Sequence, residues 1–165
     1  MHIRTIRTED AKNYLNLCKK LDRETEFRLY EPGEMNITID QQRKIIRDLI
    51  KNKKSTLLVV DIYGQLVGYL LALGRDINRV KHCVHVSIGI LQNYVGQGIG
   101  TKLFIELEKW AIQNQIHRLE LTVMVNNKAG QALYKKMGFK VEGVKEHSLF
   151  VNGRYIDDIY MAKLI

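Results

Sequence analysis

The fold of this 165-residue chain is decided by the stretch Leu91-Gln92-Asn93-Tyr94-Val95-Gly96-Gln97-Gly98-Ile99-Gly100-Thr101-Lys102. A mostly apolar run over residues 82–90 precedes it and predicts a strand. Apolar residues at helical spacing follow it from residue 99 to residue 113. We therefore expect a glycine-rich turn that leads from a strand into a long helix.

This turn has the properties of an anion site. Glycines at alternate positions let the backbone turn sharply and approach a ligand without a Cβ clash. The turn ends at a predicted helix N-terminus, where unpaired N–H groups and the helix dipole attract negative charge. Residues 91–105 contain no Asp or Glu, but they do contain Lys102. Phosphate binding is the functional interpretation, and a glycine turn needed only for packing is the structural alternative.

Two common phosphate motifs do not fit the stretch. The dinucleotide pattern GxGxxG, started at Gly96, needs a glycine where Thr101 stands. The nucleoside-triphosphate pattern GxxxxGK[ST] occurs nowhere in the chain. The preceding strand adds a clue, because Gly89 lies between Ile88 and Ile90. It marks either a bulge or a place where an extended ligand pairs with the backbone of Ile88 and Ile90.

Outward from this stretch, the chain alternates short strands and helices without a linker or repeat. Helices are predicted to start at Thr8-Glu9-Asp10, at the capping box Thr38-Ile39-Asp40-Gln41, and at residue 129. The other predicted strands are 3–7, 56–62, 66–73, 119–125, 139–146 and 155–162, the last pair joined at Asn152-Gly153. Hairpins around strand–helix–strand units predict one α/β domain, residues 1–165, with a mixed, mostly antiparallel sheet covered by helices on both faces.

Composition narrows the class of protein. The chain is 45% hydrophobic with one proline, which argues against disorder, and no apolar run reaches the length of a membrane span. The first residues are charged rather than apolar, so we expect no secretory signal. Cys18 and Cys83 are the only cysteines, which excludes a disulfide framework and a cysteine-rich zinc site. We therefore expect a cytoplasmic protein without a metal. The net charge of +8 favours anionic partners, but it does not distinguish nucleic acid, an anionic membrane and a phosphorylated small molecule.

Two later segments complete a recognisable pattern. The first begins a short helix at Asn126-Asn127-Lys128-Ala129 and runs through Leu133-Tyr134 to Gly138-Phe139. The second is the final hairpin, Asn152-Gly153-Arg154-Tyr155-Ile156-Asp157. Together with the glycine turn, in this order and spacing, they resemble the GNAT superfamily of N-acetyltransferases over most of the chain.

The resemblance implies transfer of an acetyl group from acetyl-CoA to an amine in a ternary complex. It makes Tyr134 the general acid, a role that fits a hydroxyl able to donate to the departing sulfur near neutral pH. It assigns the cofactor site to Ile88, Gly89, Ile90, Val95, Gly96, Gln97, Gly98, Ile99, Gly100, Thr101, Asn127 and Tyr134. Val95 departs from the family, which usually has Arg or Gln there, so a side-chain contact to phosphate is lost.

The acceptor side is less defined. The resemblance places a base on the strand face of Val84 and Val86, so no base is carried over; His82 shares that face, and His85 points elsewhere. Glu31, Glu34 and His85 are candidates for the acceptor site, and the acidic segment 24–37 suits a cationic amine. A small molecule and a peptide amine are both compatible.

Other readings stay open. A non-catalytic acyl-CoA-binding domain would share the fold, and the terminal strands offer a surface for a homodimer. A nucleic-acid-binding module is disfavoured, because its best basic cluster, Lys51, Lys53 and Lys54, follows a helix whose dipole it complements.

Overall fold

The computed structural model describes residues 1–165 and contains one seven-stranded sheet in the order β1-β2-β3-β4-β5-β7-β6. The strands are β1 (His2–Thr5), β2 (Thr56–Ile62), β3 (Gln65–Gly74), β4 (Cys83–Ile90), β5 (Arg118–Met124), β6 (Lys140–Val151) and β7 (Arg154–Leu164). The helices are α1 (Ala11–Glu24), α2 (Ile39–Lys51), α3 (Ile99–Gln113) and α4 (Lys128–Lys136), with short 3-10 turns at Thr8–Asp10 and Gln92–Tyr94.

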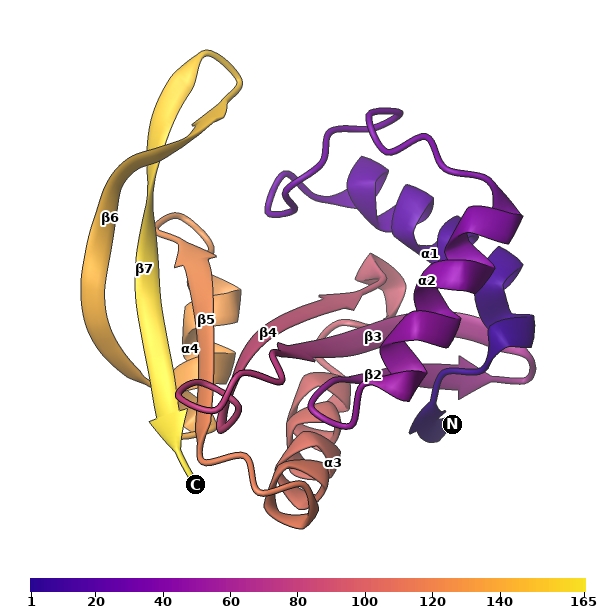
Figure 1. The fold of residues 1–165 in the computed structure, drawn as a ribbon. Helices are drawn as coiled ribbons and strands as arrows, with labels where there is room; N and C mark the ends of the chain where they lie inside the picture. Colours follow the sequence, from indigo (N-terminus) through magenta and orange to yellow (C-terminus); the bar gives the residue numbers. More distant parts are fainter.

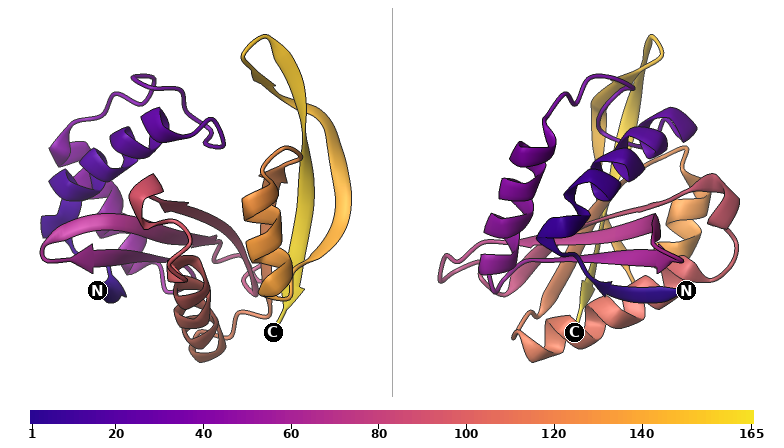
Figure 2. Two further views of the ribbon diagram at one scale, coloured as in Figure 1. Left: turned by 180° about the vertical axis from the view of Figure 1, so that it is seen from behind. Right: turned by 90° about the vertical axis from the view of Figure 1, so that its right-hand side faces the viewer.

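The sheet is covered on both faces. Helices α1 and α2 pack on one face, while α3 lies across the other and α4 lies against β5 (Figures 1 and 2). Every strand pair is antiparallel except β4 with β5. The predicted mixed, mostly antiparallel sheet with helices on both faces is therefore confirmed.

Local sequence signals account for most element boundaries. Thr38 and Gln41 form the expected capping box at the start of α2. Gly138 has a φ of 87° directly after α4, which is the left-handed conformation that ends a helix. Asn152 and Gly153 have φ values of 50° and 77°, as a two-residue hairpin turn requires.

Strands β6 and β7 are longer than their predicted ranges of 139–146 and 155–162. The pairing register shifts between Lys145 and Leu149, which breaks the alternation from which a strand is recognised. Most of β6 is also exposed, because it is the edge strand of the sheet. The two strands form a long hairpin that rises past the rest of the sheet (Figure 1).

The sheet opens between its two central strands. Parallel pairing of β4 with β5 covers only Cys83–His85 against Arg118–Glu120. Past these residues the strands diverge, as the ribbon shows (Figure 1). The backbone edge of β4 from residue 86 to residue 90 is thus unpaired on the side of β5.

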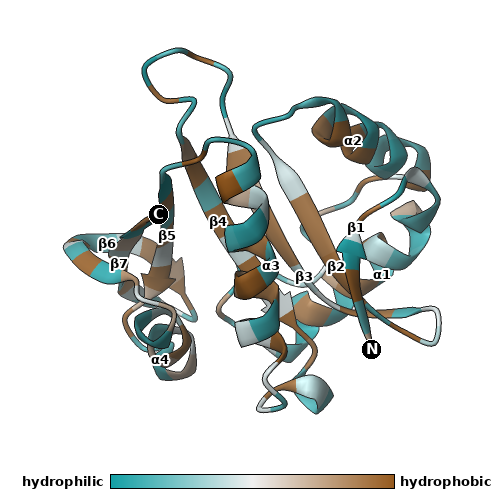
Figure 3. Cartoon of the chain, turned by 90° about the horizontal axis from the view of Figure 1, so that it is seen from below, coloured by the Kyte–Doolittle hydropathy of each residue, from teal (hydrophilic) through white to brown (hydrophobic).

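One hydrophobic core of 31 buried residues extends across both faces of the sheet. Hydrophobic residues gather on the central strands and on the helix sides that face them (Figure 3). Leu103, Phe104 and Leu107 of α3 are fully buried, which fixes the helix that follows the glycine turn. None of the helices has the length and apolar character needed to cross a membrane.

Candidate active site

The glycine turn has left-handed backbone at two positions. Gly96 and Gly98 have φ values of 80° and 76°, and a Cβ at either position would meet no atom within 4 Å. The requirement for glycine is therefore conformational rather than steric, since a side chain in this region of φ is strained.

The same turn leaves a row of backbone donors free. The N–H of Lys102 donates to the carbonyl of Gly98 at 3.1 Å, which is the first hydrogen bond of α3. The six preceding N–H groups, from Gly96 to Thr101, donate to no acceptor in the chain. Six free amides at a helix N-terminus, with no Asp or Glu in the turn itself, form a cradle for a phosphate-bearing ligand.

Two contacts hold this turn in place. The carboxylate of Glu24, at the end of α1, accepts a hydrogen bond from the N–H of Gln92 at 2.8 Å. The side-chain amide of Gln97 donates to the carbonyl of Asn93 at 3.0 Å. The turn is therefore anchored to the opposite helix layer as well as to itself.

The predicted cofactor residues of the turn differ in their exposure to solvent. Val95 is 49% exposed, and Gln97 is also exposed. Ile99 and Gly100 are buried, so they offer only their backbone N–H groups to a ligand. A Cβ on Gly100 would lie 2.7 Å from Cδ2 of Leu133, which shows that this glycine serves the close approach of α3 to α4.

The open edge of β4 presents the backbone of Ile88 and Ile90. The N–H of Leu91 donates to the carbonyl of Val67 on β3 at 2.9 Å. Because backbone groups alternate sides along a strand, Ile88 and Ile90 direct their N–H and C=O groups away from β3, toward β5. An extended ligand can pair with them there, as an added strand would.

Gly89 does not form a bulge, because the register between β3 and β4 is continuous. A Cβ on Gly89 would lie 2.7 Å from Cε1 of Tyr69 and 2.8 Å from Cδ1 of Leu21. The bulge interpretation is therefore wrong. The close approach predicted at this glycine is made by side chains of β3 and α1, on the face opposite to α3.

Asn127 is the N-cap of α4, as its position predicts. Its Oδ1 accepts a hydrogen bond from the N–H of Gly130 at 2.9 Å. A Cβ on Gly130 would lie 2.8 Å from Nδ2 of Asn127, so the glycine makes room for the cap. The Nδ2 group makes no hydrogen bond within the chain and remains a donor for a ligand beside α4.

Tyr134 lies on α4 with 8% of its surface exposed. Its ring packs against Phe104 and Phe139, with centroids 5.9 and 6.1 Å away. Burial raises the pKa of its hydroxyl to about 12, and the charge of an ionised Tyr69 would add to the rise. The Tyr134 hydroxyl makes no hydrogen bond within the chain. It is not among the fully buried side-chain nitrogen and oxygen atoms that lack a partner, because Ser148 Oγ is the only such atom. The Tyr134 oxygen is therefore a protonated donor that is not fully buried.

The acceptor-side candidates are not drawn together. Glu31 and Glu34 are exposed, and the carboxylate of Glu34 accepts from the N–H of Glu31 at 2.9 Å within their own turn. His85 is exposed on the same face of the sheet as Gly89. Val84 and Val86 are buried on the opposite face, against the α3 layer. The face that meets the segment after α1 is thus that of His85.

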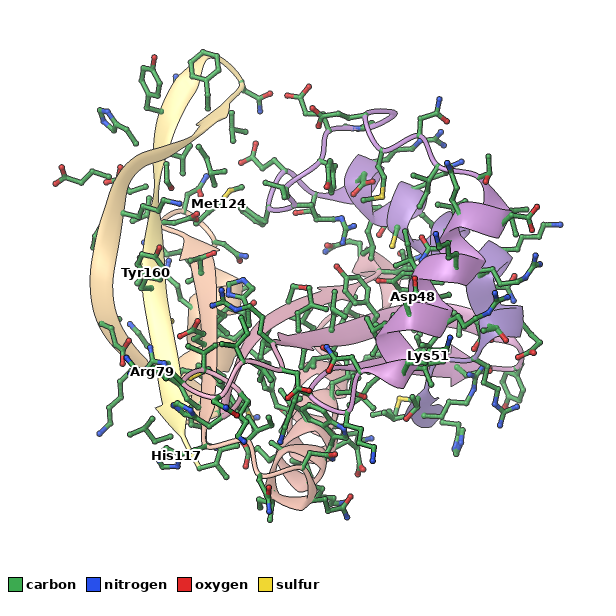
Figure 4. All side chains as sticks on the ribbon, in the orientation of Figure 1. Asp48, Lys51, Arg79, His117, Met124 and Tyr160 are labelled. Atoms are coloured by element: carbon green, nitrogen blue, oxygen red, sulfur yellow. The ribbon has the colours of Figure 1, made fainter.

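Glu26, rather than Glu31 or Glu34, reaches across to the other half of the sheet. Its carboxylate accepts hydrogen bonds from the side-chain amides of Asn126 at 3.4 Å and Asn152 at 3.0 Å. Asn126 follows the end of β5, and Asn152 lies at the tip of the β6–β7 hairpin. Met124 ends β5 at the edge of the same gap (Figure 4).

A second cluster that the sequence pattern did not reveal lies beside Gly89. Arg28 pairs with Asp22 and donates to the hydroxyl of Tyr69 at 2.6 Å. These residues come from the irregular segment, from α1 and from β3, and no spacing rule connects them. The only signal was that Arg28 is a basic residue in an otherwise acidic segment.

Two further features bear on other classes of site. Nowhere are three His, Cys, Asp or Glu side chains grouped so that they could hold a metal ion. In the basic cluster after α2, the ammonium of Lys54 donates to the carbonyl of Asn114 at 2.8 Å. This contact ties the Lys54 side chain to the end of α3.

Comparisons with known proteins fit this geometry. A family model described as "Acetyltransferase (GNAT) family" matches residues 16–139. The L-amino acid N-acetyltransferase AaaT of Escherichia coli is 32% identical over 111 residues, which are 65% of this chain and 67% of AaaT.

Solved structures agree over the whole chain. A GNAT-family acetyltransferase from Streptococcus pneumoniae superposes with a TM-score of 0.95 at 27% identity, covering 99% of this chain and 98% of its own. An acetyltransferase from Salmonella typhimurium, solved with its cofactor acetyl-CoA, has a TM-score of 0.87 at 19% identity and covers 99% and 93%. The fold is shared along the entire length.

Proposed function

The chain belongs to the acetyltransferase (GNAT) family and is an acyltransferase, and from that premise we propose that it transfers the acetyl group of acetyl-CoA directly to a primary amine. The observation that carries the proposal is the row of six free N–H groups from Gly96 to Thr101, next to the open edge of β4. A diphosphate and an extended amide-containing arm are the two parts of coenzyme A that such groups would bind.

In this proposal each part of the site has one task. The amides of Gly96 to Thr101 hold the pyrophosphate, and the backbone of Ile88 and Ile90 pairs with the pantetheine arm. A backbone N–H at this edge would also polarise the thioester carbonyl and stabilise the oxyanion that forms on attack. The Nδ2 group of Asn127 donates to the arm from the opposite side of the gap.

Tyr134 is the proposed general acid. The amine nitrogen forms a bond to the carbonyl carbon, and the carbon–sulfur bond then breaks with its electron pair on sulfur. The Tyr134 hydroxyl donates its proton to that sulfur. The amine loses one proton when it becomes an amide, and this proton replaces the one that Tyr134 gave up. The raised pKa keeps the hydroxyl protonated throughout the neutral range.

The scope of the proposal is one N-acetyltransferase domain, residues 1–165, acting in the cytoplasm without a metal. Its two cysteines are unpaired, which suits a reducing compartment. AaaT is named for L-amino acid acceptors, so small amines come first among acceptors to test. A homodimer through the edge strand β6 is a further proposal, supported by exposed Val141 and Val144 and tested by analytical ultracentrifugation.

The test is a calorimetric titration of the protein with acetyl-CoA, with NAD and ATP as controls, followed by a thiol-release assay over amine acceptors. Selective binding with a Kd of about 1 μM or tighter, worth about 8 kcal/mol, together with thiol release that depends on an amine, supports the proposal. Binding without release for any amine would replace it with a non-catalytic acyl-CoA-binding domain. Absence of binding would overturn it.

A further inference from the structure

The cluster of Arg28, Asp22 and Tyr69 lies where an acceptor would meet the thioester. Arg28 is in the segment after α1, and its side chain is 14% exposed, while that of Asp22 is 6% exposed. The guanidinium Nε donates to Asp22, and Nη1 donates to the Tyr69 hydroxyl at 2.6 Å. Tyr69 is in turn packed edge-to-face on Tyr14, with centroids 5.5 Å apart. The guanidinium is therefore held in one place.

This guanidinium is only partly satisfied by the chain. Its second terminal nitrogen, Nη2, donates to no protein acceptor. Nη2 is also absent from the fully buried atoms that lack a partner, a class that holds only Ser148 Oγ. Nη2 therefore keeps some accessible surface, with the thiol of Cys18 also within reach of the guanidinium. A guanidinium that served packing alone would have no reason to leave its terminal donors open in a half-buried place.

The position of Arg28 relates it directly to the proposed reaction centre. A Cβ built on Gly89 would lie 3.4 Å from Nη1 of Arg28. Gly89 lies between Ile88 and Ile90, whose backbone is proposed to hold the acyl arm. The free donors of Arg28 are thus beside the thioester end of the site, on the sheet face covered by the segment after α1.

Arg28 also keeps its charge in this setting. Burial by itself lowers the pKa of the guanidinium, but the neighbouring Tyr69 hydroxyl and Asp22 carboxylate raise it overall. A planar guanidinium with free terminal N–H groups is the side chain best suited to grip a carboxylate. The acidic residues noted in the sequence, Glu31 and Glu34, are exposed on the outside of this segment and do not reach the cluster.

We propose that the acceptor is an amine with a carboxylate close to its nitrogen, as in a free α-amino acid, and that Arg28 binds that carboxylate. This inference rests on the proposed function and narrows it. A carboxylate on Nη2 would place the neighbouring amine near the acyl carbon held along Ile88–Ile90. Polyamines and peptide N-termini, which lack a carboxylate beside the amine, would lose this contact.

The test compares matched acceptors on the full chain. Each L-amino acid is paired with its own carboxamide, which keeps the side chain and removes the negative charge. Because the amide also lowers the pKa of the amino group, kcat/KM is compared per neutral amine. Steady-state kcat/KM by thiol release should favour the best amino acid over its amide by at least tenfold. That factor corresponds to about 1.4 kcal/mol, a typical value for a charge-assisted hydrogen bond.

Variants then assign the preference to Arg28. In Arg28→Gln the acid-to-amide ratio of kcat/KM should collapse toward one, through KM for the acid, while the Kd for acetyl-CoA stays within twofold. Arg23→Gln, an exposed arginine on the last turn of α1, is the matched control and should keep the ratio. Because Arg28→Gln leaves Asp22 buried without its partner, the double variant Arg28→Gln, Asp22→Asn is measured as well, with thermal unfolding of each.

Three outcomes would overturn the inference. One is a wild-type protein that acetylates amides or simple amines as well as the matching amino acids. Another is an acid-to-amide ratio that survives Arg28→Gln in a folded protein. In both cases acetyl transfer itself stands, so the proposed function survives. The third, no thiol release with any acceptor, removes the proposed function and this inference together.

Discussion

Glu26 and Asn152, 126 residues apart in the sequence, are joined by a hydrogen bond of 3.0 Å between a carboxylate oxygen and a side-chain amide. The bond connects the segment after α1 to the tip of the β6–β7 hairpin. Within the sheet itself, the two halves pair through three parallel residue pairs between β4 and β5. Glu26 therefore closes the acceptor side of the gap at a point where the sheet does not.

Removing this contact should loosen the hairpin. For Glu26→Ala we expect faster amide exchange at residues 151–154 and a rise in KM for the acceptor of about fivefold, the equivalent of about 1 kcal/mol for the net contribution of one exposed hydrogen bond. The Kd for acetyl-CoA should stay the same, because the glycine turn is held by Glu24 instead. Glu146→Ala, an exposed carboxylate on the same hairpin, is the control. An unchanged KM with unchanged exchange would show that the contact has no role in acceptor binding.

Tyr134→Phe removes the proposed proton donor but keeps the ring that packs on Phe104 and Phe139. We expect kcat to fall by about 100-fold, at the lower end of the range for general acid catalysis. The Kd for acetyl-CoA should change by less than twofold, measured by calorimetry. Tyr160→Phe, a half-exposed hydroxyl on β7, should leave both unchanged. Equal kcat in the wild type and Tyr134→Phe would remove Tyr134 from the mechanism.

The pH dependence follows from the pKa of about 12 at Tyr134, which burial raises above its ordinary value. In the proposed mechanism the protonated hydroxyl is the active form, and it is lost only as pH rises through that value. The acceptor amine, with an ordinary pKa near 10.4 for an alkyl ammonium and lower for an α-amino group, must lose a proton to attack. We therefore expect kcat/KM to rise with pH and to show no decline at any pH up to about 10. A decline with a midpoint near pH 8 in the folded protein would contradict the assignment.

Val95 offers a gain-of-affinity test. It is 49% exposed at the start of a turn that has six free amides and no Asp or Glu of its own. In Val95→Arg a guanidinium can reach the phosphate and should tighten the Kd for acetyl-CoA by about three- to tenfold, less at high salt. Ile112→Arg adds the same charge at the far end of α3, where Ile112 is 66% exposed, and should change little. Equal effects from both variants would point to overall charge rather than a local contact.

Gly100→Ala tests the packing of α3 on α4. The added Cβ would lie 2.7 Å from Cδ2 of Leu133, so we expect the free energy of unfolding to fall by about 1–3 kcal/mol, as for other overpacked cores. Chemical denaturation of this variant is compared with Gly143→Ala, where nothing lies within 4 Å of the added Cβ. A double-mutant cycle with Leu133→Ala should show favourable coupling between the two sites. Unchanged stability in Gly100→Ala would mean that α4 shifts freely.

The sequence predicted those parts of the site that local rules determine. The glycine turn and α3 follow from backbone freedom and helical periodicity, and α3 spans the predicted residues 99–113. Asn127 was expected at a helix start and is the N-cap of α4. Tyr134 was placed by the family resemblance, but its burial between Phe104 and Phe139 depends on packing that no spacing reveals.

The acceptor side could not be predicted in the same way. The contact of Glu26 with Asn152 and that of Arg28 with Tyr69 join residues 126 and 41 positions apart. They depend on how an irregular segment lies over the sheet, for which no periodicity exists. The acidic composition of the segment favours Glu31 and Glu34 as acceptor-site residues, whereas the charged group that lies against β4 is Arg28.

The open edge of β4 has a consequence for association between chains. Unpaired strand edges normally invite other strands to add to them, which leads to aggregation. Here the edge over residues 86–90 is in the interior of the sheet, with β5 and α4 standing opposite to it (Figure 1). A second sheet cannot dock against an edge enclosed in this way, whereas a single narrow arm can slide in. The fold can thus leave the backbone of residues 86–90 unpaired and still prevent strands of another chain from adding to it.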